Sequence, residues 1–315
     1  MKNVLITVSS YSARCITGCK LLRDNQFNLI FKNSINHLIQ SDTLRESIDA
    51  VIAGTDCYNA SIFPLLPKLK IISRFGTGID NIDTGAAKRS GIVVNNAQGI
   101  NANAVAEFVI GLIFSGLRNI PANHMDMQNG YWGYSLGNEL NGKRVGLLGF
   151  GNIAKTLVKR LSGFDIEILA HDTCPDRELA EKMAVKIVSI DDLFMQSNVI
   201  IVLLPYTSSL ENFISHKYLS MMRNGALLIN AARGKLIDER ALLQVIDERN
   251  VFAALDVFQH EPLPQFSPLL HSRNIITTPH IAAATVESYH QTGIHTARSV
   301  IDFFNGKPIE NIYSD

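Results

Sequence analysis

Short, wholly apolar segments recur along this chain and constrain its fold more than any other feature. Two of them read VIIVL at residues 199–203 and ALLIN at residues 226–230, where only the closing Asn230 is polar. A strand that is apolar on both sides has to be covered on both faces, as happens in a parallel sheet between two helix layers. Segments with helical spacing separate the apolar runs, so the sequence predicts an α/β fold built on parallel sheets.

The predicted strands form two sets, which indicates two Rossmann-like domains. After the second set, Thr285–Asn305 has helical spacing and no further strand follows, so this helix is expected to return to the first domain. We therefore predict a discontinuous, flavodoxin-like domain of residues 1–98 plus 285–315, into which residues 99–284 are inserted. The predicted strands are Val4–Val8, Ala50–Ala53, Lys70–Ser73, Ile92–Asn95, Arg144–Leu148, Glu167–His171, Val185–Ile187, Val199–Leu203, Ala226–Asn230, Phe252–Asp256 and Ile275–Thr277, and helical segments are expected at Thr43–Ile48, Ser61–Leu66, Asn101–Arg118 and Lys155–Leu161.

Composition excludes several classes of partner. Lys+Arg and Asp+Glu are equal at 29 each, so no charge excess drives binding to nucleic acid or to an anionic membrane. The longest apolar stretch, Ala104–Leu117, is shorter than the roughly 20 residues that a bilayer span needs. The four cysteines form no CxxC pair and no metal-ligand spacing with histidine. We expect a cytoplasmic protein that binds a small molecule and holds no metal.

A glycine-rich turn lies between a predicted strand and a predicted helix. Residues 149–154 read GFGNIA, which fits the GxGxxA pattern. Gly149 permits a tight turn, and Gly151 lets the backbone approach a pyrophosphate at the helix N-terminus, where Asn152 and Ile153 supply N–H groups. The turn predicts dinucleotide binding, although a glycine turn without a ligand is the alternative on the motif alone.

An acidic residue follows the next predicted strand, where adenosine ribose hydroxyls would be bound. Asp172 occupies this position, and no Arg or Lys occurs at 173–176 to hold a 2′-phosphate. The sequence therefore favours NAD over NADP. A helix cap or loop acid is the alternative interpretation of Asp172.

Three polar residues close or follow short apolar runs in the second half of the chain. Arg233, Glu261 and His280 are each expected where a buried strand emerges into a loop, which is where ligands bind in open α/β sheets. In isolation each would be read as a structural or surface residue. Their occurrence together, downstream of a nucleotide turn, indicates hydride chemistry.

The chain resembles the D-2-hydroxyacid dehydrogenases, and within that family it is most similar to the D-3-phosphoglycerate dehydrogenase-like branch. The resemblance covers nearly the whole chain and is more specific for the family than for its substrate. It is carried by the segments Lys68–Asp83, Gly99–Ile113, Gly130–Leu161, Leu203–Thr207, Asn230–Leu242, Leu255–Pro262 and Thr278–Thr285.

The resemblance implies catalytic roles that the residue types support. His280 would exchange the hydroxyl proton while hydride passes to or from the nicotinamide, because histidine titrates near neutral pH. Glu261 would hydrogen-bond the imidazole, fix its tautomer and favour its protonated form. Arg233 offers a planar fork that matches a substrate carboxylate and polarises the adjacent carbonyl.

The resemblance also implies further cofactor contacts and a substrate loop. Pro205 and Thr207 would contact NAD from their loop, and Asp256 would lie near the nicotinamide carboxamide; turn formation is the alternative for all three. In the substrate loop the N–H groups around Gly76, Thr77 and Gly78 would hold the substrate carboxylate. Arg74 and the Gly54–Asp56 loop would bind the distal group of the substrate. Asn81 and Asp83 are expected to cap the next helix.

Several readings of the whole protein stay open. The leading one is an NAD-dependent D-2-hydroxyacid dehydrogenase with its substrate, possibly 3-phosphoglycerate, in a cleft between the domains. Glyoxylate or hydroxypyruvate reductase and phosphite dehydrogenase are alternatives, whereas Glu261 argues against formate dehydrogenase, which places glutamine there. A NAD(H)-sensing regulator like the C-terminal-binding-protein corepressors is an alternative of another class.

Two expectations concern assembly and regulation. The apolar Val105–Leu117 segment and the polar arm Pro121–Asn141, which holds the single Trp132, are the region through which the family dimerises, so a homodimer is expected. Because the sequence given stops at Asp315, without the regulatory domain of longer phosphoglycerate dehydrogenases, control by serine is not expected.

Overall fold

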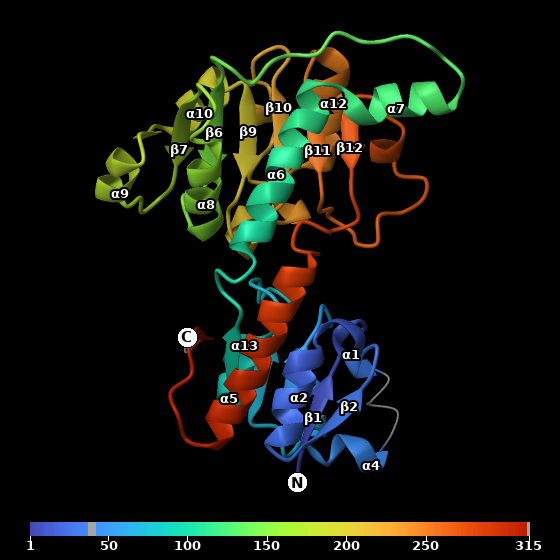
Figure 1. Ribbon diagram of the computed structural model, residues 1–315, viewed down its shortest axis with the longest axis vertical. Coiled ribbons are helices and arrows are strands. Elements are labelled where there is room, and N and C mark those ends of the chain that lie inside the picture. Colours follow the sequence, from blue (N-terminus) through green and yellow to red (C-terminus); the bar gives the residue numbers. More distant parts are fainter. Residues whose placement is uncertain (37–41, 314–315) are drawn as a thin grey trace. The chain divides into compact units, whose positions relative to one another are not determined.

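The computed structural model describes residues 1–36 and 42–313, and the chain divides into two compact units (Figure 1). Unit 1 comprises Met1–Asn101 and Ala284–Asp315, and unit 2 comprises Ala102–Ala283. Each unit contains one sheet with helices on both faces, so the predicted α/β class is confirmed.

The sheet of unit 2 is wholly parallel and has the order β12-β11-β10-β9-β6-β7-β8. The chain starts in the middle, at β6, fills one side and then crosses to β9 to fill the other. This reversal between β6 and β9 is the topological switch point, where doubly wound sheets bind ligands at the carboxyl ends of their strands. The strands are β6 Arg144–Leu148, β7 Glu167–His171, β8 Val185–Ile187, β9 Val199–Val202, β10 Leu227–Asn230, β11 Phe252–Leu255 and β12 Ile275–Thr277.

Two helix layers cover this sheet, which explains why its strands are apolar throughout. Helices α6 and α8 bury Val109, Leu157 and Leu161 completely against one face, while α10 and α12 bury Leu193 and Leu242 against the other. Each such side chain contributes about 1.5–3 kcal/mol by leaving water. The helices of unit 2 are α6 Ala102–Leu117, α7 Ile120–Gln128, α8 Asn152–Leu161, α9 Arg177–Lys182, α10 Ile190–Gln196, α11 His216–Leu219 and α12 Glu239–Glu248, with 3-10 turns η2 Ser208–Leu210, η3 Gly234–Leu236 and η4 Pro268–Leu270.

Unit 1 has the sheet order β13-β5-β4-β3-β1-β2, in which every pair is parallel except β13 with β5. Helices α2 and α13 pack on one face, and α5 packs on the other. The elements are β1 Lys2–Ile6, α1 Tyr11–Arg14, α2 Ile16–Asp24, β2 Phe27–Phe31, α4 Asp42–Arg45, β3 Ile48–Ala53, η1 Phe63–Leu65, β4 Ile71–Arg74, α5 Thr84–Arg89, β5 Val93–Asn96, α13 Val286–Phe304 and β13 Ile312–Tyr313.

Several predictions of secondary structure were wrong, and two strands were not predicted. The expectation of no strand after the last helix is corrected by β13, too short to show a periodicity. The edge strand β2 was missed because Asn28 interrupts its apolar run and it is only partly buried. Of the two early helical segments, only α4 and the single turn η1 form, because Ile48 already starts β3 and Pro64 and Pro67 limit the second segment. The first part of the polar arm at 121–141 belongs to a helix, α7, which the sequence analysis did not predict.

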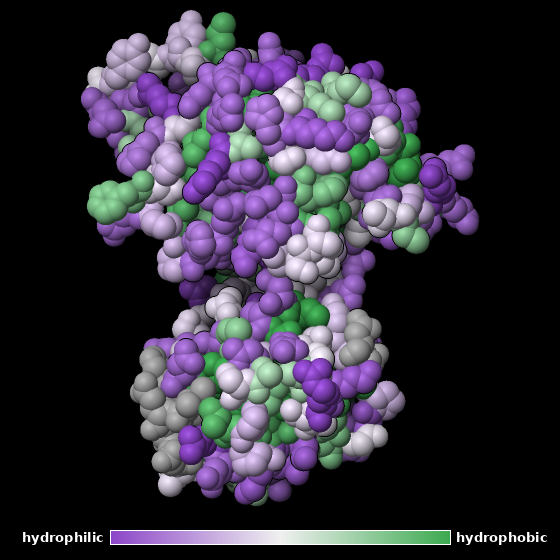
Figure 2. Space-filling view, turned by 180° about the vertical axis from the view of Figure 1, so that it is seen from behind, coloured by the Kyte–Doolittle hydropathy of each residue, from purple (hydrophilic) through white to green (hydrophobic). Residues whose placement is uncertain are grey.

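The hydropathy of the surface and the length of the helices bear on whether the chain could span a membrane. Figure 2 shows one face of the molecule, on which hydrophilic side chains predominate and hydrophobic ones gather in separate patches. Within the described residues no single helix has the length and apolar character to cross a membrane; only the pair α6 and α7, bent by 63°, passes such a test together. Half of the residues of α6 are buried within unit 2.

Candidate active site

The glycine-rich turn follows β6 at the switch point and has the backbone shape that the motif predicts. Gly149 has φ +103°, and a Cβ there would lie 3.0 Å from the Leu203 carbonyl carbon and oxygen. Its N–H donates to His171 O at 2.8 Å, so the turn is tied to β7. Gly151 is the N-cap of α8, and a Cβ there would meet no atom within 4 Å. The turn therefore leaves open space beside the backbone where a dinucleotide phosphate could approach.

Asp172 stabilises this turn directly. Its Oδ2 accepts the N–H of Phe150 at 2.8 Å, and its Oδ1 accepts the N–H of Cys174 at 2.9 Å. The carboxylate thus fixes the residue between the two glycines, a role that the sequence did not reveal. A carboxylate oxygen has two lone pairs, so each can accept another hydrogen bond. Contact with ribose hydroxyls therefore stays a prediction for Asp172.

The other predicted cofactor residues lie around the same edge of the sheet. Asn152 and Ile153 begin α8, whose first N–H groups have no acceptor within the helix and favour an anion. Pro205 and Thr207 are exposed in the loop after β9, the strand beside β6. The Thr207 hydroxyl is paired with Ser209 Oγ at 2.9 Å. The switch point thus has an open glycine turn, a helix N-terminus and an exposed polar loop, which together suit a dinucleotide.

Arg233 lies in a hydrogen-bonded turn after β10. Asn230 ends that strand and is 1% exposed. Its Oδ1 accepts the N–H of Ala232 at 3.0 Å, and its Nδ2 donates to Arg233 O at 2.9 Å. The partly buried Arg233 side chain donates from Nη1 to Ala232 O at 2.8 Å. The buried amide therefore sets the position from which the guanidinium extends.

His280 and Glu261 form a hydrogen-bonded pair, as the sequence predicts. His280 Nδ1 lies 2.7 Å from Glu261 Oε2, and both side chains reach the surface of unit 2, at 45% and 37% exposure. Burial raises the pKa of Glu261, but hydrogen bonds from His280 and from Phe258 N–H, with the charges of His280 and Arg233, outweigh burial and hold this pKa below its ordinary value. An ionised Glu261 fixes the proton on Nδ1 and leaves Nε2 for proton transfer.

The backbone of His280 is held in an unusual conformation by Asp256. His280 has φ +53°, and its N–H donates to Asp256 O at 2.8 Å. The Asp256 side chain is fully buried and accepts Thr278 Oγ1 at 2.7 Å, Ile281 N at 2.9 Å and Ala282 N at 2.9 Å. Asp256 thus fixes the segment on both sides of His280. Its predicted contact with the nicotinamide stays a prediction.

The predicted substrate loop of unit 1 is folded tightly on itself. Gly76 has φ +144°, and its N–H donates to Arg74 O at 2.9 Å, so this N–H is engaged within the loop. The Arg74 guanidinium donates from Nη1 to the carbonyls of Ala53 and Phe75. The Thr77 hydroxyl donates to Asn101 Oδ1 at 3.0 Å. A carboxylate-binding role at this loop therefore depends on the N–H groups of Thr77 and Gly78.

The two residues predicted as helix caps differ. Asp83 is the N-cap of α5 and accepts the N–H of Ala86 at 2.8 Å, which confirms that prediction. Asn81 does not cap the helix; its Nδ2 donates to Gly54 O at 3.1 Å and to Asp56 O at 2.5 Å. The prediction for Asn81 was wrong because its amide instead holds the loop after β3.

Comparison with known proteins identifies the family. Residues 110–282 match the family model described as the D-isomer specific 2-hydroxyacid dehydrogenase, NAD binding domain. The chain belongs to the D-isomer specific 2-hydroxyacid dehydrogenase family. It therefore carries the NAD-binding domain of that family, in agreement with the turn, the helix N-terminus and Asp172 at the switch point.

Individual relatives bear different names. The chain is 38% identical to D-3-phosphoglycerate dehydrogenase of Archaeoglobus fulgidus over 83% of this chain and 50% of that protein. It is 37% identical to hydroxypyruvate reductase of Thermotoga maritima over 79% of this chain and 82% of that protein. The fold matches NAD+-bound 3-phosphoglycerate dehydrogenase in Entamoeba histolytica, with a TM-score of 0.84, 25% identity and coverage of 100% and 99% of the two chains. The chain thus spans about half the length of the first phosphoglycerate dehydrogenases it resembles.

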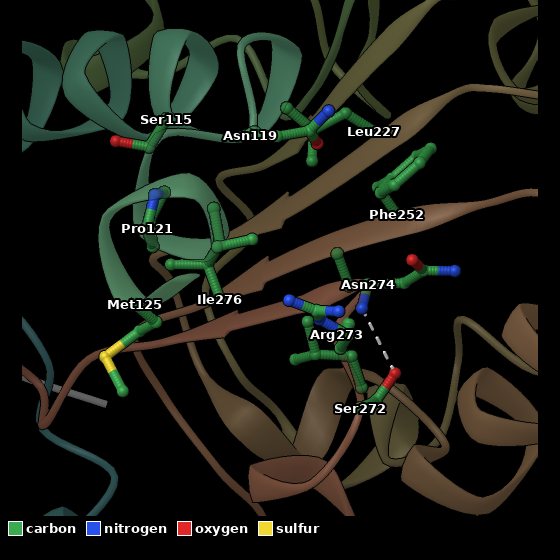
Figure 3. Close-up of a pocket in the computed structure, with 14 residues that line it drawn as sticks. Ser115, Asn119, Pro121, Met125, Leu227, Phe252, Ser272, Arg273, Asn274 and Ile276 are labelled. Atoms are coloured by element: carbon green, nitrogen blue, oxygen red, sulfur yellow. Dashed lines mark hydrogen bonds between the residues drawn. The ribbon is translucent and has the colours of Figure 1, made fainter. Parts of the chain in front are cut away.

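A cavity of about 220 Å³ lies in unit 2, at the edge of the sheet opposite the candidate cofactor and catalytic residues. Leu227, Phe252 and Ile275, which begin β10, β11 and β12, contribute to its lining. Figure 3 shows Ser272, Arg273 and Asn274 on one side of it and residues from α6 and α7 on the other. The candidate catalytic residues follow the carboxyl ends of the same strands, so this cavity is separate from the catalytic site.

Proposed function

We propose that this protein is an NAD-dependent D-2-hydroxyacid dehydrogenase, which transfers hydride between the nicotinamide and a small 2-hydroxy or 2-keto acid. The observation that carries the proposal is the 2.7 Å hydrogen bond between His280 and Glu261, in a unit with an open glycine turn at its switch point. An imidazole oriented by a carboxylate is suited to proton transfer beside a bound nucleotide.

Each catalytic candidate has a role consistent with its contacts. In the reduction of a 2-keto acid, His280 donates a proton from Nε2 to the substrate oxygen, and Glu261 stabilises the imidazolium from which it comes. Arg233 binds the substrate carboxylate and polarises the carbonyl beside it. When bound, NADH supplies the hydride. For unit 1, we propose that Thr77 and Gly78 hold substrate through backbone N–H groups.

The substrate is proposed as a class rather than one compound. Relatives of similar identity are named D-3-phosphoglycerate dehydrogenase, glyoxylate reductase and hydroxypyruvate reductase. Arg74, the cation expected to bind a distal phosphate, already donates to two carbonyls within unit 1. One such cation supplies a single positive charge, which is modest for a phosphate, so we favour a small unphosphorylated acid; the phosphorylated three-carbon acid is the alternative to test.

A substrate panel tests the proposal. NADH oxidation is measured with glyoxylate, hydroxypyruvate, pyruvate, branched 2-keto acids and 3-phosphohydroxypyruvate at matched concentrations. We expect at least one unphosphorylated acid to give kcat/KM above about 10⁴ M⁻¹s⁻¹, the lower end for enzymes on their own substrates. NADH without a keto acid is the control. Preference for 3-phosphohydroxypyruvate would keep the mechanism but reverse the substrate assignment, and tight NADH binding without any turnover would favour a NAD(H)-sensing protein.

We further propose that the protein is a cytoplasmic homodimer. The segment between α7 and β6, a long stretch without helix or strand in Figure 1, exposes four large apolar side chains. Tyr131, Trp132, Tyr134 and Leu136 are 64%, 88%, 85% and 87% exposed, and contiguous apolar exposure of this kind usually marks an interface. The exposed free thiols of Cys57 and Cys174 support a reducing compartment.

Light scattering during size-exclusion chromatography tests the dimer. We expect twice the chain mass of 34.8 kDa at micromolar concentration. Trp132→Ser should raise the dimer dissociation constant about tenfold or more, since buried tryptophans dominate interface energies. Phe266→Ser is the matched control, because Phe266 is 90% exposed elsewhere on unit 2. A wild-type monomer would refute the proposal.

A further inference from the structure

Two segments that carry catalytic candidates lie in direct backbone contact. Gly234 follows Arg233, and a Cβ on Gly234 would lie 1.9 Å from the carbonyl carbon of Phe258. No side chain fits at that distance, so the two backbones approach closely only because residue 234 is glycine. Phe258 in turn donates its N–H to Glu261 Oε1 at 3.1 Å. The turn that presents Arg233 therefore rests on the segment that holds Glu261.

Hydrogen bonds join the same two segments immediately beyond this contact. Glu239 Oε1 accepts the N–H of Gln259 at 2.7 Å. The Gln259 side chain adds a second hydrogen bond between the segments, because its Nε2 donates to Ile237 O at 2.8 Å. The same Nε2 also donates to Asn212 Oδ1 at 2.8 Å. The residues that connect the two segments are Gly234, Ile237, Glu239, Phe258 and Gln259. Residues 256–261 are thus tied to residues 233–239 by one steric contact and two hydrogen bonds.

The Glu239 carboxylate is suited to accept a hydrogen bond from another segment of the fold. Glu239 is the first residue of α12 and is partly buried, and Asp238, not Glu239, caps the helix by accepting the N–H groups of Arg240 and Ala241. Burial raises the pKa of Glu239, against the opposing effects of the Gln259 N–H and the charge of His260. The carboxylate is therefore not needed as a helix cap, and its nearest partner is the segment that leads to Glu261.

We propose that Glu239 and Gln259 are positioning residues, which set the location of the Glu261–His280 pair relative to Arg233. This inference rests on the proposed function, because it assigns Arg233 to the substrate carboxylate and His280 to proton transfer. In that reaction the carboxylate and the oxygen that receives the proton belong to adjacent carbons, so the two protein groups have to be held at a fixed separation. A displacement of about 1 Å can cost about 10²-fold in rate.

The central experiment compares Glu239→Ala with Glu239→Gln. Glu239→Ala removes the acceptor for the Gln259 N–H, whereas Glu239→Gln keeps an oxygen in its place. We expect Glu239→Ala to lower kcat about 10- to 100-fold, and Glu239→Gln to restore it to within about threefold of wild type. NADH affinity, measured by fluorescence titration, should stay within about twofold in both, because the nucleotide turn follows β6. Glu248→Ala is the matched control, since Glu248 lies exposed at the far end of α12 and should leave kcat unchanged.

A double-mutant cycle separates positioning from a general loss of structure. If Glu239 acts through Glu261, Glu239→Ala should lower kcat much less in a Glu261→Gln background than in the wild type. Its pH profile for keto acid reduction should also move toward acid, as we expect for Glu261→Gln, because the Glu261–His280 hydrogen bond is disturbed in the first variant and weakened in the second. Equal effects of Glu239→Ala in the two backgrounds, or a parallel loss of kcat and NADH binding, would overturn the inference. Absence of turnover in the wild type would instead refute the proposed function.

Discussion

His280→Asn is expected to lower kcat for 2-keto acid reduction by about 10²–10⁴-fold, the range that a positioned acid or base contributes. NADH affinity should change less than about twofold, because the glycine turn and α8 belong to a different part of the sheet. Asparagine is the substitution of choice because His280 has φ +53°, a conformation that asparagine tolerates better than alanine. The variant therefore removes the imidazole and retains the backbone that presents it.

Steady-state kinetics and NADH fluorescence titration measure these two effects separately. His124→Asn, at an exposed histidine of α7, is the control and should have wild-type kinetics. Thermal stability should change little, since asparagine tolerates the left-handed backbone and the lost hydrogen bond to Glu261 lies at the surface. Loss of NADH binding and turnover to the same degree would mean that His280 is structural and would contradict the acid–base assignment.

The sequence predicted the fold class and most elements because their signals are local. Apolar runs such as 199–203 and 226–230 require a sheet covered on both faces, and the structure has them as central strands β9 and β10. The glycine pattern at 149–151 likewise predicts a turn whose shape depends on its own residues. The strands β2 and β13 were missed because pairing with a neighbouring strand, rather than their own sequence, defines them.

The supporting contacts of the candidate site could not be predicted in the same way. Asp172, Asp256 and Glu239 each hold a backbone N–H from another segment, and nothing in the local sequence specifies which N–H that is. Gly234 reads as an ordinary loop glycine until Phe258 is placed against it. The sequence thus pointed to the candidate catalytic side chains, whereas the residues that hold them in place required the three-dimensional arrangement.

Asp256→Asn is expected to be strongly damaging, although the two side chains have nearly the same shape. Asp256 is fully buried, and its two carboxylate oxygens accept three hydrogen bonds from the segment around His280. Asparagine offers one acceptor oxygen, which can retain the bonds to Thr278 and Ile281. Its NH₂ group would then face the N–H of Ala282, so two donors would meet without an acceptor in the core. Hydrogen bonds to charged groups contribute about 1.5–3 kcal/mol, and an unsatisfied buried group costs about 1–3 kcal/mol.

We therefore expect Asp256→Asn to reduce the free energy of unfolding by about 2–4 kcal/mol. Because the His280 N–H donates to the Asp256 carbonyl and the Ala282 N–H to its side chain, kcat should also fall, by about tenfold or more for a misplaced acid–base group. Urea denaturation measures the first effect, and keto acid reduction at a temperature below the unfolding transition of the variant measures the second. Asp247→Asn, at an exposed position of α12, is the control and should change neither. Unchanged stability would show that the three hydrogen bonds do not hold the segment, and lost stability with full kcat would show that they hold it without positioning His280.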